Sequence, residues 1–343
     1  MVSPKNILIV RTDRIGDVVL SLPMAELIKK KYPDCKVTYF IRDYTSSLID
    51  GNPFIDEVFI AEESDGEILF GKNLKKIKSK KFDTCVVVNP TLTISLIMFL
   101  SGIQNRIGTG YRWYSFLFNQ KVFEHRKHGD KHELEYNINL LNKIDINFKD
   151  FSNEIKFHLN VNEKSSEKIN LILYEKGFKS GNKIVIIHPG SGGSSVDLRK
   201  DKLIQLTGRI GNLNSVTIII TGSKSESELC REFEITESVV NLSGQLDLSL
   251  LKALINKADL FISNSTGPMH IAAALGVHVI GFFPKILSCS QKRWGPYTEK
   301  RTIFSPTIDC SNCTREQCEK LDCMNSIDIG RVFDETKTVL KIL

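Results

Sequence analysis

Residues Leu260–Phe283 read LFISNSTGPMHIAAALGVHVIGFF. The apolar run 260–262 is typical of a buried parallel strand, and it breaks into polar residues at 263–267. Pro268 suits the first position of a helix, and Gly276 suits the residue just beyond its end. The apolar segment 278–283 follows at once. This order predicts a strand, a tight turn, a helix and a second strand, which form one unit of a parallel α/β sheet.

The turn in this stretch is a candidate phosphate site. It joins the carboxyl end of a predicted strand to the start of a helix, where backbone N–H groups and the helix dipole favour an anion. The predicted substrate-binding residues here are Asn264, Ser265, Thr266, Gly267, Pro268, Met269 and His270. The alternative is an ordinary crossover in which Ser and Thr only cap the helix.

A second junction has the same form. The apolar run Lys183–Ile187 leads into His188–Ser195, HPGSGGSS, whose three glycines let a backbone approach a ligand closely. The segment lacks the Gly-Lys-Ser/Thr of a Walker phosphate loop and the G-x-G-x-x-G of a dinucleotide site. It is a plausible phosphate or sugar cradle, with Ser191 and Gly192 as candidate binding residues.

A third junction opens the chain. The buried-strand run Asn6–Val10 is followed by Arg11-Thr12-Asp13-Arg14-Ile15-Gly16-Asp17. Charged residues directly after a buried strand lower stability unless they are solvated or paired, so this cluster favours a functional role. The alternative is a surface ion-pair cluster.

Composition describes an ordinary water-soluble chain. With 343 residues, 41% hydrophobic and 25% charged, it suits two domains. The longest apolar stretch, Leu92–Leu100, has half the length needed to cross a bilayer, and the N-terminus does not read as a secretory signal. We therefore expect a cytoplasmic protein.

Charge is local rather than global. The net charge of +6 is modest, and aromatic residues are not interleaved with basic ones, so nucleic acid is not an expected partner. The segment Lys72–Lys81, KNLKKIKSKK, holds six lysines. Its default interpretation is a solvated helix face; the alternative is a docking patch for a phosphorylated substrate or an anionic membrane surface.

Strand and helix patterns alternate through the whole chain in two similar halves. Predicted strands are Ile7–Val10, Val37–Ile41, Val58–Ile60, Cys85–Asn89, Ile184–His188, Val216–Thr221, Val239–Leu242, Leu260–Ser263 and Val279–Phe283. A polar seam near Asn160–Ser166 divides the chain into domains 1–163 and 164–343. The prediction is an α/β protein with two Rossmann-like, doubly wound domains facing each other across a cleft, where ligands bind at the sheet edges.

Four cysteines crowd the C-terminal region as Cys310-x2-Cys313-x4-Cys318-x4-Cys323. Disulfides are not expected in the cytoplasm, so the cluster suggests a structural zinc or another thiophilic metal such as iron. The alternative is a set of free or redox-active thiols. The histidines show no HExxH spacing, so a catalytic metal has no evident ligand set.

Together the three junctions resemble a known family. Arg14–Pro23 (RIGDVVLSLP), His188–Gly192 (HPGSG) and Ser263–Gly276 (SNSTGPMHIAAALG) resemble, in order and spacing, the signature segments of glycosyltransferase family nine, the ADP-heptose:lipopolysaccharide heptosyltransferases. The cysteine cluster, preceded by the turn Trp294–Pro296, is also similar to a segment that many members carry. The resemblance covers nearly the whole chain.

This resemblance implies a GT-B fold that transfers a sugar with inversion and without a catalytic metal or other required cofactor. The N-terminal domain mainly holds the acceptor, and the C-terminal domain holds the nucleotide sugar, ADP-heptose. Asp13, Arg14 and Gly16 are candidate substrate-binding residues. Asp17 is the implied general base, with Asp13 as the competing candidate and Arg11 or Arg14 as its ion-pair partner. The implied acceptor is a lipid-linked or phosphorylated sugar of the lipopolysaccharide inner core, reached through peripheral contact with the cytoplasmic face of the inner membrane.

The chain departs from the family pattern at the donor site. Many members have Asp where this chain has Ser265, and Lys shortly after the glycine loop, where this chain has Ser195–Asp197. The sugar hydroxyl that the aspartate would bind is then expected to contact Ser265 or Asn264. The phosphate charge is expected to be met by Arg199, Lys200 or Lys202.

Other functions and a weaker acceptor signal stay open. A GT-B transferase or epimerase with a different nucleotide sugar, and a binding module without activity, remain alternatives. On the acceptor side, Arg106–Gly108 and Tyr111–Tyr114 offer arginines for anions and aromatic rings for sugar stacking, or form a surface loop.

Overall fold

The computed structural model describes residues 3–152, 154–308 and 313–342. The chain divides into two compact units. The N-terminal unit contains Met1–Arg126 and Lys131–Asn160, and the C-terminal unit contains Lys127–Asp130 and Val161–Leu343. The division after Asn160 lies close to the predicted seam at residue 163.

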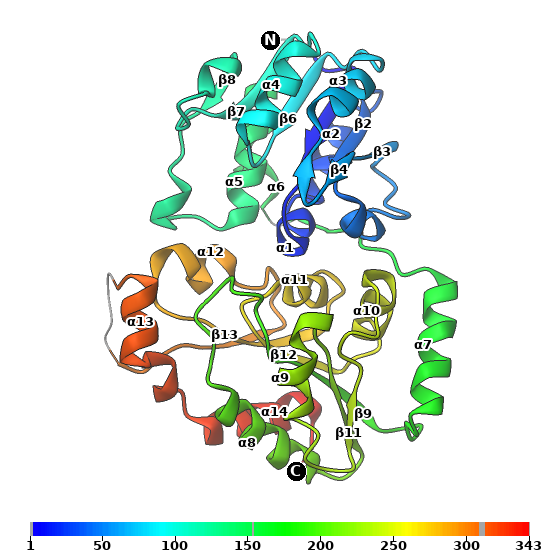
Figure 1. The fold of residues 1–343 in the computed structure, drawn as a ribbon, viewed down its shortest axis with the longest axis vertical. Coiled ribbons are helices and arrows are strands. Elements are labelled where there is room, and N and C mark those ends of the chain that lie inside the picture. The colour runs from blue at the N-terminus through cyan, green and yellow to red at the C-terminus, as the bar shows by residue number, and fades with distance from the viewer. Residues whose placement is uncertain (1–2, 153, 309–312, 343) are drawn as a thin grey trace. The chain divides into compact units, whose positions relative to one another are not determined.

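The N-terminal unit is built on a six-stranded sheet in which every neighbouring pair of strands is parallel. Its order is β3-β2-β1-β6-β7-β8, and a separate antiparallel pair is β4-β5 (Figure 1). The strands are β1 (Asn6–Val10), β2 (Lys36–Ile41), β3 (Glu57–Ile60), β4 (Glu63–Ser64), β5 (Glu67–Ile68), β6 (Thr84–Val87), β7 (Asn105–Thr109) and β8 (Gln120–Val122). The helices are α1 (Ile15–Val19), α2 (Pro23–Lys31), α3 (Phe70–Lys78), α4 (Leu92–Leu100), α5 (Glu133–Asn139) and α6 (Phe148–Phe151), with 3₁₀ turns η1 (Asp43–Leu48), η2 (Ser115–Leu117) and η4 (Leu140–Ile144). A further 3₁₀ turn, η3 (Arg126–His128), begins at the last residue of the first segment of this unit and continues into the short segment that belongs to the C-terminal unit.

The C-terminal unit repeats this plan. Its parallel sheet has the order β11-β10-β9-β12-β13-β14. The strands are β9 (Lys183–His188), β10 (Val216–Ile220), β11 (Val239–Asn241), β12 (Leu260–Asn264), β13 (His278–Phe282) and β14 (Arg301–Phe304). The helices are α7 (Glu163–Glu175), α8 (Lys200–Gly211), α9 (Ser227–Arg231), α10 (Leu248–Ile255), α11 (Gly267–Ala274), α12 (Gln291–Trp294), α13 (Arg315–Leu321) and α14 (Ile329–Leu340), with 3₁₀ turns η5 (Lys224–Glu226), η6 (Leu287–Cys289) and η7 (Cys323–Ser326).

Each main sheet has the strand order of a doubly wound nucleotide-binding fold. The first strand of each unit lies at the centre, and the chain winds outward first to one side and then to the other. The order reverses between β1 and β6 in the N-terminal unit, and between β9 and β12 in the C-terminal unit. Ligands bind beyond the carboxyl ends of strands at such switch points. The three junctions singled out in the sequence all follow strands at these two points.

Apolar burial holds the helices on the sheets. Strand β1 is almost fully buried from Ile7 to Val10, as expected for a central parallel strand. On one face of this sheet, side chains of α3 and α4, including Ile77 and Ile97, pack in the same cluster as Leu8. Within the described ranges no helix is both long enough and apolar enough to cross a membrane.

Candidate active site

The β1–α1 junction gathers charged side chains around one buried arginine. Arg11, the first residue after β1, is 1% exposed. Its Nε lies 2.9 Å from Oδ1 of Asp13, and its Nη2 donates a hydrogen bond to Oδ1 of Asp17. Arg14 is exposed. Of the two arginines that the sequence leaves open as ion-pair partners, Arg11 pairs with both aspartates.

Asp17 has the electrostatics of a proton acceptor. It lies in the first turn of α1, and its side chain is 17% exposed. Burial, together with the carboxylates of Asp13 and Glu133, raises the pKa of Asp17 to about 6, against the opposing effect of Arg11. A carboxylate with a pKa slightly below neutral is ionised at pH 7 and still a stronger base than an exposed one.

Two neighbouring strands fix the backbone of this turn. Oδ2 of Asp13 accepts a hydrogen bond from Nδ2 of Asn89, which follows β6, at 2.9 Å. The hydroxyl of Tyr44 donates to the carbonyl oxygen of Asp13 at 2.6 Å, and Nε of Arg42 donates to that of Thr12 at 2.7 Å. The carboxyl ends of β2 and β6 therefore hold the loop that carries the charged cluster.

Glu133, on α5, belongs to this cluster and was not predicted. It is 1% exposed, its Oε1 accepts a hydrogen bond from Arg126, and the same oxygen lies 3.7 Å from Nη2 of Arg11. Asn137, one turn along, accepts from Arg126 at 3.2 Å and donates to the carbonyl oxygen of Leu20 at 3.1 Å. Glu133 and Asn137 are polar residues at i and i+4 on the buried face of a helix, a signal that the sequence carried.

In the C-terminal unit, β12 delivers the chain to the N-terminus of α11. Thr266 is the N-cap residue, and within the described residues its side chain makes no hydrogen bond to the first turn of α11. The alternative for this turn was that its Ser and Thr residues only cap the helix; Thr266, at the N-cap position, does not do so. Uncapped first-turn N–H groups are the kind of group that binds anions at helix N-termini.

Asn264 links the two junctions of this unit. Its side chain is fully buried; Nδ2 donates to the carbonyl oxygen of Pro189 at 2.7 Å, and Oδ1 accepts from the backbone N–H of Leu198 at 2.8 Å. The two ends of the glycine loop after β9 are thus held against the end of β12. This use of the Asn264 amide makes it a positioning group for the loop.

The glycine loop itself turns through left-handed backbone. Gly192 and Gly193 have φ values of +55° and +72°, which glycine adopts without a steric penalty. The side chain of Arg315, on α13, donates to the carbonyl oxygens of Gly193 at 2.7 Å and Ser195 at 2.9 Å. The C-terminal cysteine-rich region therefore braces the loop through Arg315, a contact that the sequence analysis missed.

A buried histidine and a carboxylate flank the start of this loop. Nδ1 of His188 lies 2.9 Å from Oγ1 of Thr221, and burial lowers the pKa of His188 to about 4, so the ring is neutral at pH 7. A Cβ at Gly190 would come within 1.9 Å of Oε1 of Glu226, so any larger residue at this position would force that carboxylate to move. Oε2 of Glu226 accepts from the N–H of Ser223 at 2.8 Å. Glu226 was not predicted.

The cations predicted to meet a phosphate bind protein acceptors here. Lys200 pairs with Glu232 at 2.8 Å, and Arg199 pairs with an aspartate two positions along the chain at 3.0 Å. The ammonium group of Lys202 donates to the carbonyl oxygen of Ile327 at 2.7 Å. Lys202 thus ties α8 to the C-terminal segment, and a role in binding substrate remains a prediction for all three.

The remaining predicted residues of α11 are largely inside the unit. Pro268 is buried, Met269 is fully buried, and His270 is 4% exposed with its ring centroid 6.5 Å from that of Trp294. Ser191 is 6% exposed and donates from Oγ to Asp197 at 3.0 Å. Their proposed contact with substrate stays a prediction.

Residues 71–323 match the sequence model of glycosyltransferase family 9 (heptosyltransferase). The matched range is most of the chain and contains both junctions of the C-terminal unit. The chain belongs to this family.

Curated relatives of this family 9 chain span most of its length. One is a Haemophilus influenzae protein assigned to the glycosyltransferases without a donor or acceptor in its name, 29% identical over 88% of this chain and 89% of the relative. Another is the lipopolysaccharide core heptosyltransferase OpsX of the same organism, 24% identical over 82% of this chain and 79% of the relative.

Solved structures share the fold. E. coli ADP-heptose lipopolysaccharide heptosyltransferase II matches with a TM-score of 0.79 and 18% identity, covering 98% of both chains. E. coli heptosyltransferase WaaC, solved with ADP-2-deoxy-2-fluoro heptose, matches with a TM-score of 0.68 and 14% identity over 96% of this chain and 99% of that one. The predicted GT-B fold, α/β with two parallel six-stranded sheets, is confirmed.

The cysteine cluster of this family 9 chain is only partly described. Cys310 lies outside the described residues. Cys318 and Cys323 are buried in the core of the C-terminal unit, and Cys313 packs at its margin. Among the described residues there is no group of three or more His, Cys, Asp or Glu that could hold a metal. The iron-containing glycosyltransferase TibC of enterotoxigenic E. coli shares the fold, with a TM-score of 0.59 and 12% identity over 98% of this chain and 76% of that one.

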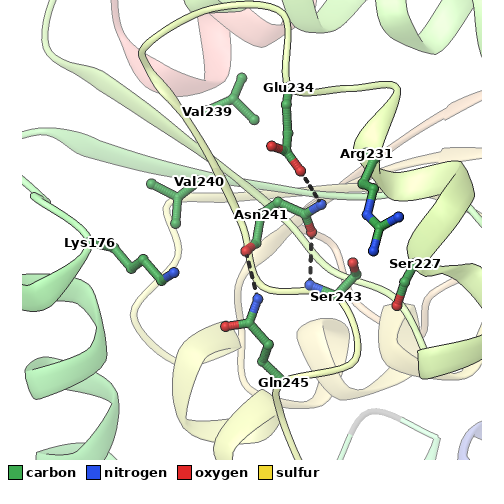
Figure 2. A pocket seen from close by; sticks show the side chains of 9 residues that line it. All are labelled: Lys176, Ser227, Arg231, Glu234, Val239, Val240, Asn241, Ser243 and Gln245. Atoms are coloured by element: carbon green, nitrogen blue, oxygen red, sulfur yellow. Dashed lines mark hydrogen bonds between the residues drawn. The ribbon is translucent and has the colours of Figure 1, made fainter.

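A separate pocket of about 440 Å³ lies along the edge strand β11 of this family 9 chain. Figure 2 shows Asn241 near the middle of the residues that line the pocket. Nδ2 of Asn241 donates to Oε1 of Glu234 at 2.6 Å, and the backbone carbonyl oxygen of Asn241 accepts from Nε2 of Gln245 at 3.1 Å. The residues that line this pocket are Lys176, Ser227, Arg231, Glu234, Val239, Val240, Asn241, Ser243 and Gln245. These residues differ from those predicted to bind substrate, so the pocket is not part of the predicted site.

Proposed function

We propose that the chain transfers heptose from ADP-heptose to an acceptor of the lipopolysaccharide inner core. Membership of the heptosyltransferase family supports the reaction class. A relative named as a lipopolysaccharide core heptosyltransferase supports the acceptor class. A WaaC structure holding an ADP-heptose analogue supports the donor.

The observation that carries the proposal is the Arg11–Asp17 pair at the end of β1. Asp17 removes the proton from the acceptor hydroxyl as its oxygen attacks the anomeric carbon of the donor, the sugar configuration inverts, and ADP leaves. General-base catalysis of this kind is worth roughly 10²–10⁴-fold. Asp17 suits this role better than Asp13, because both oxygens of Asp13 contact protein groups, Arg11 and Asn89.

The C-terminal unit supplies the donor site in this proposal. The diphosphate lies at the N-terminus of α11, where first-turn N–H groups and the helix dipole stabilise the charge that develops on the leaving group. Ser265 takes the position where many family members have Asp, and the Ser265 hydroxyl forms a hydrogen bond with a hydroxyl of the donor sugar. Backbone dipoles meet most of the donor charge in this proposal, because Lys200 and Lys202 already contact protein acceptors.

The proposed acceptor is a phosphorylated, lipid-linked sugar presented at the cytoplasmic face of the inner membrane. Arg106 contributes less than the sequence suggested, because its Nε donates to the carbonyl oxygen of Leu117 at 2.8 Å and its guanidinium stacks on Phe99. Arg112 and Trp113 are exposed and stay candidates for acceptor contact.

We propose that transfer requires no catalytic metal, and that any metal at the cysteine cluster is structural. The donor dipoles and the Asp17 base act without one. Transfer assayed in the presence and absence of a chelator tests this point: an unchanged rate is expected, and a loss that added metal restores would contradict it.

Calorimetry with the purified chain tests the donor assignment. ADP-heptose, ADP and UDP-sugars are titrated separately without divalent cations. Tighter binding of ADP-heptose than of any UDP-sugar is the expected result. Preference for a UDP-sugar would instead indicate a GT-B transferase or epimerase with a different donor. Sugar transfer at an unchanged rate by the Asp17→Asn variant would show that Asp17 is not the general base.

A further inference from the structure

Helix α4 exposes an apolar stripe to solvent. Its outward residues, Leu92, Leu96, Phe99 and Leu100, follow the i, i+4, i+7, i+8 spacing of one helical face. Leu92 is 37%, Phe99 45% and Leu100 46% exposed, while Ile97 on the opposite face is fully buried. The inner face of such a helix packs on its own sheet, and an apolar outer face marks a surface that binds another apolar partner.

Two exposed aromatic side chains extend this stripe. Trp113 is 75% exposed and Phe116 is 67% exposed; both lie on the segment that joins β7 to β8. The turn η2 in that segment contacts α4. Large aromatic rings with this exposure are typical of protein and membrane interfaces, where one side of the ring is apolar and the other is wet.

Helix α3 adds positive charge on the same side of the sheet. It packs against α4 (Figure 1), and the inner residues of both helices belong to one apolar cluster on one face of the first sheet. Lys72, Lys75 and Lys78 of α3 are exposed. In the described part of the chain they form no salt bridge, whereas Lys76 and Lys80 pair with glutamates.

The surrounding sequence has almost no negative charge. Residues 69–123 contain nine lysine and arginine residues and one acidic residue, Asp83, and therefore carry a net charge of +8. The whole chain carries a net charge of +6, so the residues outside this region together carry a net charge of only −2. The carboxylate of Asp83 accepts from the backbone N–H groups of Lys5 and Asn6.

We propose that this surface docks on an anionic lipid bilayer. The α3–α4 surface is defined by Lys72, Lys75, Lys78, Leu92, Leu96, Phe99, Leu100, Trp113 and Phe116. Lysines next to an exposed apolar stripe match a layer of anionic headgroups over acyl chains. A second copy of this chain is a poorer partner, because a two-fold contact through this surface would bring like charges together. The proposal does not depend on the donor or on Asp17.

Sedimentation with vesicles tests the proposal on the full chain. Vesicles of phosphatidylcholine with phosphatidylglycerol are compared with vesicles of phosphatidylcholine alone. We expect binding to the anionic vesicles, and a loss of about tenfold or more in the triple variant Lys72→Glu, Lys75→Glu, Lys78→Glu, since each lysine contributes separately to attraction by the surface potential. The matched control changes three exposed lysines of α7 and its end, Lys164, Lys168 and Lys176, to Glu, and should bind as the native chain does.

The apolar part of the surface is tested separately. Phe99→Ser with Leu100→Ser should weaken vesicle binding, whereas Leu171→Ser with Tyr174→Ser, which are even more exposed and lie on α7, should leave it unchanged. Brominated lipids should quench the fluorescence of Trp113, and Trp113→Phe should remove that quenching. Equal binding to both vesicle types, equal losses in the α7 controls, or dimers that Phe99→Ser dissociates would each overturn the proposal.

Discussion

The guanidinium of Arg11 donates a hydrogen bond to the carboxylate of Asp17, six residues along the chain, at the buried carboxyl end of the central strand β1. The same guanidinium meets Asp13 and Glu133, so three carboxylates surround it. Burial and the neighbouring carboxylates raise the pKa of Asp17, and the hydrogen bond from Arg11 holds its side chain in place.

Asp17→Asn should abolish most transfer. We expect kcat to fall by roughly 10²–10⁴-fold, because the amide cannot accept the acceptor's proton. Donor affinity, measured by calorimetry, should stay unchanged. Asp13→Asn is the matched control and should lose less activity. A larger loss for Asp13→Asn than for Asp17→Asn would exchange the two roles.

The same variant should be more stable than the native chain near neutral pH. The pKa of Asp17 is about 6 in the folded state and near 4 when unfolded, so the folded chain binds this proton more tightly. The stabilising effect of this protonation is fully present below about pH 4 and is lost as pH rises to about 6. Removing the ionised carboxyl should therefore raise the free energy of unfolding at pH 7 by about 1–3 kcal/mol. Thermal unfolding at pH 7 and pH 4 measures it; an equal gain at both pH values would contradict the assignment.

Glu133→Gln should move the acid limb of the pH–rate profile. The carboxylate of Glu133 raises the pKa of Asp17, so its removal should lower that pKa and extend activity to lower pH. The measurement is kcat/KM as a function of pH. Glu135→Gln, two residues along the same helix, is the control and should leave the limb in place. An unshifted limb in Glu133→Gln would show that this residue does not act on the catalytic proton.

Asn264→Ala should destabilise the fold and weaken donor binding together. The change leaves the carbonyl oxygen of Pro189 and the N–H of Leu198 buried without their partner, which costs about 1–3 kcal/mol. Chemical denaturation and donor calorimetry measure the two effects. Ser263→Ala is the matched control, because within the described residues the buried Ser263 hydroxyl makes no hydrogen bond. Equal losses in both variants would remove the positioning role of Asn264.

Arg315→Ala should weaken donor binding with little change in stability. The guanidinium is partly exposed, so its contacts contribute modestly to folding, but they hold the carbonyl groups of Gly193 and Ser195. We expect a several-fold rise in the donor Kd and a melting temperature close to that of the native chain. Glu319→Gln removes the ion pair of Arg315 without touching the loop and should bind donor normally. An unchanged Kd in Arg315→Ala would show that the contacts of Arg315 with the glycine loop do not matter for donor binding.

Local patterns were sufficient for the central strands and for the turns after them. An apolar run that breaks into polar residues, glycine or proline predicts the end of a buried strand. Strands β1 and β9 end at the predicted residues, Val10 and His188, and β12 ends at Asn264, one residue beyond the predicted Ser263. The outer strands β7, β8 and β14 were missed. Asn105–Thr109 and Gln120–Val122 are short, half-buried and partly polar, so their pairing with a neighbour, rather than their own composition, makes them strands.

The sequence by itself determined the parallel α/β class, the two-fold repetition of the chain and the three polar junctions, because each of these depends on neighbouring residues and on the period of apolar side chains. Only the tertiary structure decided which groups meet at those junctions. Arg11 meets Glu133, and Arg315 meets Gly193, across more than a hundred residues of chain. Such contacts depend on strand order and helix packing, and so do the pKa of Asp17 and the brace on the glycine loop.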